Sequence, residues 1–179
     1  MTDMSGFWVI LTAGTVFLVF FTWISSIREK RFHGYPRFVA FEGIFILVLL
    51  NRNAWFLDPW SFRQLVSWAL LLVSLAAVIA GFTALRRYGK PDGRFENTTR
   101  LVNRGIYGLI RHPMYASLLF FGAGAFLKGI GLAQAVVLGF TIAVTWLTAL
   151  MDEKEMKARF GAEYTDYMSK TRRFIPFLI

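Results

Sequence analysis

Three side chains capable of polar chemistry lie within five residues, in the stretch Arg111-His112-Pro113-Met114-Tyr115. Proline is favoured in the first turn of a helix, where its missing N–H is not needed, so we predict that a helix begins here. His112 and Tyr115 then lie one turn apart, directly after Arg111. A cation, a ring nitrogen and a phenol at a helix start can hold an anion such as a carboxylate or phosphate. The alternative is that Arg111 anchors a membrane interface and Tyr115 belongs to an aromatic belt.

A second polar group, Asp152-Glu153, directly follows a long apolar run. A structural interpretation is that these acids balance nearby positive charge and occupy the first turn of a tail helix, whose dipole favours them. The break Gly129-Ile130-Gly131, however, predicts that the two spans on either side of it form a helical hairpin. Its two arms would be antiparallel, so the acids would lie at the same depth as Arg111 and His112. A carboxylate beside a guanidinium suits a zwitterionic amino-acid group.

The elements that position these groups are predicted to be membrane-spanning helices. Hydrophobic residues make up 56% of the chain and charged residues only 17%. Uncharged runs approach the ~20 residues that a helix needs to cross a bilayer, and backbone in hydrocarbon must satisfy its own hydrogen bonds. We therefore expect an all-α integral membrane protein of about five transmembrane helices: Phe7–Ile24, Phe38–Leu50, Leu65–Leu85, Pro113–Leu127 and Leu132–Met151.

The chain divides into a three-span N-terminal membrane part, residues 1–85, and a second part, residues 86–179. The second part contains a polar cofactor-binding segment, the C-terminal helical hairpin and a tail. Met156, Phe160 and Tyr164 recur at helical spacing after the last span, which predicts an amphipathic tail helix on the cytoplasmic face, with Gly161 as a possible break.

The positions of lysine and arginine predict the orientation, because cytoplasmic loops are enriched in both. With the N-terminus outside and the C-terminus in the cytoplasm, 17 of the 20 basic residues lie inside. Only Arg52, Arg63 and Lys128 would lie outside. We expect a protein of the inner or plasma membrane whose site is cytoplasmic. The inner basic residues are Arg28, Lys30, Arg31, Arg37, Arg86, Arg87, Lys90, Arg94, Arg100, Arg104, Arg111, Lys154, Lys157, Arg159, Lys170, Arg172 and Arg173.

The composition also narrows the partners. The formal net charge of +9 lies mainly at the inner ends of spans, where it would contact anionic membrane lipids, so we expect no nucleic-acid partner. The chain has no cysteine and only two histidines, so we expect no metal. Glu42 falls inside a predicted span, which makes it a candidate functional residue. Pairing with Arg37 or a neighbouring arginine is the favoured explanation.

At this point the motifs carry a family resemblance. Thr99-Arg100-Leu101-Val102-Asn103-Arg104-Gly105-Ile106-Tyr107, followed by Arg111-His112-Pro113-Met114-Tyr115, resembles the cofactor-binding stretch of the isoprenylcysteine carboxyl methyltransferases. Asp152-Glu153, Phe160-Gly161-Ala162-Glu163-Tyr164 and Arg173-Phe174-Ile175-Pro176 resemble that family's C-terminal signature. Phospholipid N-methyltransferases share a related pattern. Several ordered motifs are more specific than any single one, and together they cover residues 86–179.

The resemblance implies a methyltransferase that uses S-adenosyl-L-methionine and acts on a lipidic or membrane-partitioned acceptor. Asp152 stands where the family has a glutamate. Thr148 stands where prenylcysteine enzymes have a substrate-contacting arginine, which argues against a prenylcysteine acceptor. The residues implied to bind the cofactor are Thr99, Arg100, Leu101, Val102, Tyr107, His112, Pro113, Met114, Tyr115, Asp152 and Glu153.

We expect Asp152 or Glu153, with Arg111 or His112, to hold the amino-acid end of the cofactor, and Arg111, His112 and Glu153 are the catalytic candidates. A carboxylate acceptor needs no base, whereas an amine or thiol would draw on His112, Glu153 or Tyr115. Two other interpretations stay open. One is a sterol-type reductase that binds NADPH through Arg86, Arg87, Arg100 and Arg104. The other is a membrane scaffold without enzymatic activity.

Overall fold

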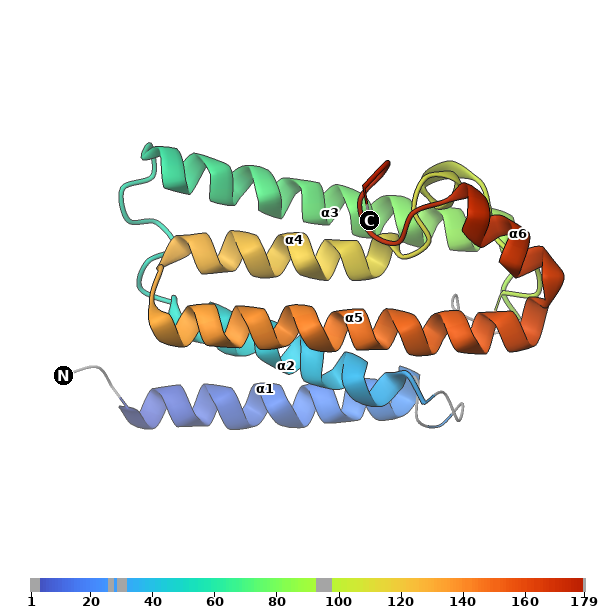
Figure 1. The fold of residues 1–179 in the computed structure, drawn as a ribbon. Coiled ribbons are helices and arrows are strands. Elements are labelled where there is room, and N and C mark those ends of the chain that lie inside the picture. Colours follow the sequence, from blue (N-terminus) through green and yellow to red (C-terminus); the bar gives the residue numbers. More distant parts are fainter. Residues whose placement is uncertain (1–3, 26–27, 29–31, 93–97, 179) are drawn as a thin grey trace.

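The computed structural model describes residues 4–25, 28, 32–92 and 98–178. Helices account for the regular structure of this part, with isolated bridges but no strand, which confirms the all-α class. Figure 1 shows their arrangement. In chain order they are α1 Met4–Ser25, α2 Gly34–Leu50, α3 Phe62–Tyr88, the 3₁₀ helix η2 Gly105–Gly108, α4 Pro113–Lys128, α5 Leu132–Phe160 and α6 Ala162–Lys170.

Three of the described helices are long and apolar enough to cross a membrane: Ser5–Ser25, Phe62–Tyr88 and Leu132–Phe160. Large apolar side chains such as Val16 and Phe17 point out of the bundle, as expected for a protein surrounded by lipid rather than water. The helices α2 and α4 have 17 and 16 residues, short of the ~20 that a spanning helix needs. The count of five spans therefore stays a prediction.

The end of α5 differs from the expectation. The helix does not stop at Met151 but runs to Phe160, because residues 152–159 are mostly good helix formers that continue it after the apolar run has ended. Gly161 then adopts a positive φ of 56° and separates α5 from α6. Asp152 and Glu153 thus lie within α5, so the explanation based on the first turn of a tail helix is wrong.

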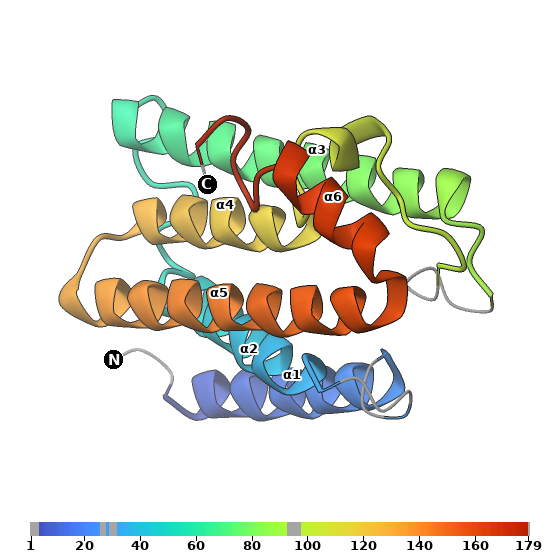
Figure 2. The ribbon, with the colours of Figure 1, turned by 45° about the vertical axis from the view of Figure 1, so that its right-hand side comes forward.

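The helix α4 lies between α3 and α5, as both ribbon views show (Figures 1 and 2). Small residues allow α3 and α4 to approach closely. Ser67 Oγ donates to the Gly124 carbonyl at 2.7 Å, and Ser74 Oγ donates to the Ser117 carbonyl at 2.8 Å. Hydrogen bonds between side chain and backbone thus fix the position of α4, whose first turn carries the predicted site.

At one end of the bundle, hydrogen bonds join the α4–α5 turn to the rest of the fold. Lys128 is fully buried, donates to Gln64 Oε1 at 2.9 Å and lies 3.6 Å from the centroid of the Trp68 ring. The opposite end carries α6 and the connection after α3 (Figure 1). Of the basic residues predicted on that side, Lys30, Arg31 and Arg94 lie outside the described part.

The predicted pairing of Glu42 with Arg37 or a neighbouring arginine is wrong. The Oε1 of Glu42 accepts a hydrogen bond of 2.6 Å from Thr15 Oγ1 of α1, and its Oε2 is buried with no hydrogen-bond partner among the described residues. Arg37 instead donates to Ser25 Oγ at 3.1 Å. The side chain of Glu42 points to α1 rather than back along its own helix, so the polar contact joins α1 to α2.

Candidate functional site

The chain after α6 holds the first turn of α4 in place. Residues 171–174 run beside residues 109–112, and Ile110 and Arg172 form a parallel bridge. The Arg111 N–H donates to the Arg172 carbonyl at 2.7 Å, and the His112 N–H donates to the Arg173 carbonyl at 3.0 Å. We call residues 171–174 the tail strap. It fixes the backbone on which both candidate side chains stand.

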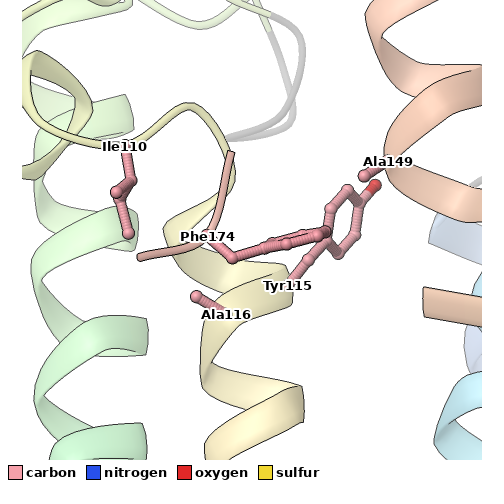
Figure 3. Close-up of a cluster of buried hydrophobic side chains, with 5 residues drawn as sticks. All are labelled: Ile110, Tyr115, Ala116, Ala149 and Phe174. Carbon is pink, nitrogen blue, oxygen red and sulfur yellow. The ribbon is translucent and has the colours of Figure 1, made fainter. Parts of the chain in front are cut away.

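Apolar packing reinforces the tail strap. Phe174 is buried in a cluster with Ile110, Tyr115, Ala116 and Ala149. Figure 3 shows the Phe174 side chain extended toward Tyr115, whose ring end lies beside Ala149 of α5. The His112 ring stacks on the Tyr115 ring at 5.4 Å between centroids. Residues from α4, α5 and the C-terminal tail therefore position His112 together.

Glu153 lies at the centre of an ion-pair network. Its Oε1 accepts hydrogen bonds from Arg111 Nε and Arg173 Nε, both at 3.0 Å, and its Oε2 accepts one from Arg173 Nη2 at 2.9 Å. His112 Nε2 lies 3.3 Å from Oε1. The Glu153 side chain is 6% exposed. Arg111 also donates to the carbonyls of Met168 and Thr171, so this network joins α4, α5 and the tail.

Asp152 lies beside this network, shares His112 with Glu153 and is more exposed. Its Oδ2 lies 3.5 Å from His112 Nδ1, and its Oδ1 lies 3.8 Å from His33 Nδ1. The Asp152 side chain is 21% exposed and lines a cavity, whereas Glu153 does not. The acid pair therefore divides its contacts: Glu153 binds the tail, and Asp152 faces the cavity.

Protonation of the neighbouring groups follows from burial and from these two acids. Burial lowers the pKa of His112, but hydrogen bonds to Asp152 and Glu153 and their negative charges outweigh it, so the pKa of His112 is raised. The pKa of Tyr164 is raised by burial and then by the same two acids. The two acids thus shift His112 toward its cationic form and Tyr164 toward its neutral form.

The cavity, which we call the inner pocket, has a volume of about 340 Å³. Side chains from every described α-helix reach it, and its lining combines the polar Asp152, Arg111 and His112 with apolar residues that include Phe21, Phe41 and Leu118. Its size falls within the range of small-molecule sites. The predicted site residues that line it are Leu101, Val102, Tyr107, Arg111, His112, Met114, Tyr115 and Asp152.

Four predicted cofactor residues do not line the inner pocket. Pro113 is buried at the start of α4 and, like Glu153, does not line the inner pocket. Thr99 and Arg100 line a second, neighbouring cavity of about 520 Å³, which shares Leu101 and Phe160 with the inner pocket. The sequence predicted one cofactor site, whereas in the structure the predicted residues are divided between two adjoining cavities.

Four titratable residues of the inner pocket were not predicted as site residues: His33, Arg37, Tyr164 and Tyr167. His33 is buried, and its Nδ1 lies 2.9 Å from Glu155 Oε2. His33 precedes α2 by one residue, 122 positions before Glu155, so no local spacing could have joined them. Tyr164 belongs to the C-terminal signature of the resemblance, and this membership could have identified it as a site residue.

One group of described residues has the composition of a metal site. The ligand atoms of His33, Asp152 and Glu155 lie within 4.8 Å of one another. His33 and Glu155 already satisfy each other through their hydrogen bond, and Asp152 faces His112. The expectation that the protein uses no metal stays a prediction, and this cluster is where it can be tested.

The fold and the inner pocket define a helical protein with three candidate membrane spans and a small-molecule-sized cavity at one end of the bundle. Residues 62–163 match the phospholipid methyltransferase family, which is related to the isoprenylcysteine carboxyl methyltransferases. The match covers more than half of the chain, so the chain belongs to this family of methyltransferases.

The chain is also similar to a protein named for metal resistance. The nickel-cobalt-cadmium resistance protein NccN of Alcaligenes xylosoxydans xylosoxydans is 28% identical over 138 residues. The similar region covers 76% of this chain and 61% of NccN, so the chain spans about three-fifths of the length of that relative. Its name specifies no methyl acceptor.

Proposed function

We propose that this protein is an integral membrane methyltransferase that uses S-adenosyl-L-methionine and methylates a lipidic or membrane-partitioned acceptor. One observation carries the proposal: a single cavity combines the Asp152 carboxylate and the His112 imidazole with an apolar wall that includes Phe21 and Phe41. A charged cofactor and an apolar acceptor need these two environments within reach of each other.

The residues present fit the cofactor. Asp152 is the partly exposed carboxylate of the inner pocket, and it is the proposed partner of the cofactor's amino group. Leu101, Val102 and Tyr107 supply an apolar and aromatic wall suited to the adenine ring. Glu153 is assigned a positioning role, because its oxygens bind Arg111 and Arg173.

The bound cofactor supplies a methyl group already activated on a positively charged sulfur. The protein's part is then to align the acceptor and to exclude water. Glu153 is committed to two arginines, and His112 lies between the carboxylates of Asp152 and Glu153, so both candidate bases already have partners that compete with proton abstraction. Both features favour an acceptor that reaches the site already deprotonated, such as a lipidic carboxylate.

The acceptor is proposed to enter from the bilayer past α1. Phe21 lines the inner pocket, yet 44% of its surface is exposed. In a chain surrounded by lipid, such a residue marks a place where acyl chains and the cavity lie close together. Lateral entry keeps an apolar acceptor out of water, in agreement with the apolar wall of the pocket.

The variant Asp152→Asn tests the role of the carboxylate while leaving its shape almost unchanged. We expect purified Asp152→Asn to bind S-adenosylhomocysteine at least tenfold more weakly than the wild type in calorimetry, about 1.4 kcal/mol. Asp166→Asn removes one acid from the exposed face of α6 and is the matched control. Wild-type affinity in Asp152→Asn would rule out the proposed amino-group contact.

Ligand protection during thermal unfolding separates the three candidate functions. A ligand that binds the folded state raises its unfolding temperature in proportion to the logarithm of the ligand concentration above the dissociation constant. We expect protection by S-adenosylhomocysteine and none by NADPH. Protection by NADPH alone would establish the reductase, and protection by neither ligand would establish the scaffold.

A further inference from the structure

The second cavity is distinguished by its charge. We call it the basic recess: it is lined by Arg87, Lys90, Arg100 and Arg104, and by one acid, Glu163. Its volume is about 520 Å³. Among the described residues, four cations thus face a single carboxylate, and this excess of positive charge lies in a hollow, where field lines are concentrated.

No carboxylate neutralises these four cations within the described residues. None of them takes part in an ion pair there within 4.0 Å. Arg87 instead lies 5.5 Å from the ring centroid of its neighbour Tyr88. Arg111 and Arg173, by contrast, both bind Glu153. Repulsion among four cations that have no ion-pair partner among the described residues is relieved when an anion binds among them.

A phosphate group matches the recess better than a carboxylate does. Arginine presents planar pairs of N–H donors that bind phosphate oxygens in a bidentate manner, and lysine adds a point charge. Three arginines and one lysine therefore offer more donors than a single carboxylate can accept. Thr99 does not add to them, because its hydroxyl donates to the Lys90 carbonyl at 2.9 Å.

The position of the recess indicates the source of that phosphate. Arg87 and Tyr88 belong to the last turn of α3, a candidate membrane span, and Lys90 follows directly. The helix dipole explains a cation at Arg87, but Lys90, Arg100 and Arg104 lie beyond the helix. A recess at the end of a span lies at headgroup level, where lipid phosphates can reach it without leaving the bilayer.

We propose that the basic recess binds the phosphate of an anionic membrane lipid, at a site separate from the inner pocket. The shared lining residues Leu101 and Phe160 place this lipid next to the inner pocket without putting its headgroup inside it. The proposal concerns binding alone. It assigns Arg100 to the lipid rather than to S-adenosylmethionine, and it competes with the NADPH interpretation, which placed Arg87, Arg100 and Arg104 on the phosphates of that cofactor.

The test uses the purified full chain in a neutral detergent, with thermal unfolding followed as lipid is added. We expect short-chain phosphatidylglycerol to raise the unfolding temperature saturably, and phosphatidylcholine at equal concentration to raise it much less. In Arg87→Gln/Arg104→Gln the apparent affinity for phosphatidylglycerol should fall at least tenfold. Lys90→Gln/Arg104→Gln serves as an independent pair, should the first variant unfold without lipid.

The matched control is Lys154→Gln/Lys157→Gln, which removes two exposed cations of α5 that line neither cavity. It should keep the response of the wild type. If this control loses as much affinity for phosphatidylglycerol as the recess variants do, the lipid responds to overall surface charge rather than to the basic recess, and the proposal is overturned. Full protection by inorganic pyrophosphate, with nothing added by phosphatidylglycerol, would overturn the assignment to a lipid and leave a soluble phosphate ligand.

Discussion

The two adjacent acids of α5 illustrate how consecutive positions of a helix can separate a structural contact from a proposed binding group. Glu153 accepts hydrogen bonds from two arginines of distant segments, whereas Asp152 faces the inner pocket and two histidines. Neighbouring helical positions point about 100° apart, so the two carboxylates meet different nitrogens of the His112 ring and otherwise have different partners. A substitution at either position should therefore have a different consequence.

We predict that Glu153→Gln lowers the free energy of unfolding by about 3 kcal/mol, because losing one partner leaves buried guanidinium groups uncompensated. Asp152→Asn should change stability much less, since that side chain is partly exposed. Unfolding in detergent, with Asp166→Asn as the control, measures both. A Glu153→Gln protein as stable as the control would show that the network contributes little.

At the scale of elements, close approach between helices determines the shape of the bundle. A Cβ added at Gly43 of α2 would lie 2.1 Å from Thr141 Oγ1 of α5, and that hydroxyl already donates to the Val137 carbonyl at 2.7 Å. No side chain larger than hydrogen fits between these two helices without movement. The helix α2 also carries Arg37 and Phe41 to the inner pocket, so its distance from α5 matters for the site.

We predict that Gly43→Ala destabilises the protein by about 1–3 kcal/mol, the usual cost of overpacking. Gly139→Ala, on α5, meets no atom within 4 Å and is the matched control, expected to be neutral or slightly stabilising. Thermal unfolding of both variants in the same detergent is the measurement. If the two variants unfold together, α2 and α5 are not in contact as described.

At the scale of the whole molecule, the elements found at each end of the helical bundle bear on its orientation in the membrane. The loop after α2 and the α4–α5 turn lie at one end of the bundle, and α6 lies at the other (Figure 1). The distribution of basic residues predicts that the end with α6 is cytoplasmic. The absence of cysteine makes this orientation testable by introducing single cysteines.

We predict that Asn53→Cys, after α2, reacts with a membrane-impermeant maleimide in intact cells, whereas Asp166→Cys, on α6, reacts only after permeabilisation. Both native side chains are exposed, so differences in reactivity report the side of the membrane rather than burial. The reverse pattern would invert the proposed topology and place the inner pocket outside the cell. Labelling of both positions in intact cells would mean that the two ends are not separated by a bilayer.

The amino-acid sequence alone determined the helical class and the hairpin, because uncharged runs in a bilayer have only one way to satisfy their backbone and a glycine break permits a tight turn. It also brought Asp152 and Glu153 to the level of Arg111 and His112, since the arms of a hairpin share their depth. Most of the predicted cofactor residues do line one cavity.

Only the tertiary structure decided which side chain meets which. The tail strap and the contact of His33 with Glu155 both join segments far apart in the chain. The cavity that each of residues 99–101 lines likewise depends on residues from distant segments. Such contacts depend on how helices pack and rotate against one another, and they leave no periodic pattern in the sequence. Periodicity shows that a residue is on a helix and on which face, but its partner is selected by packing.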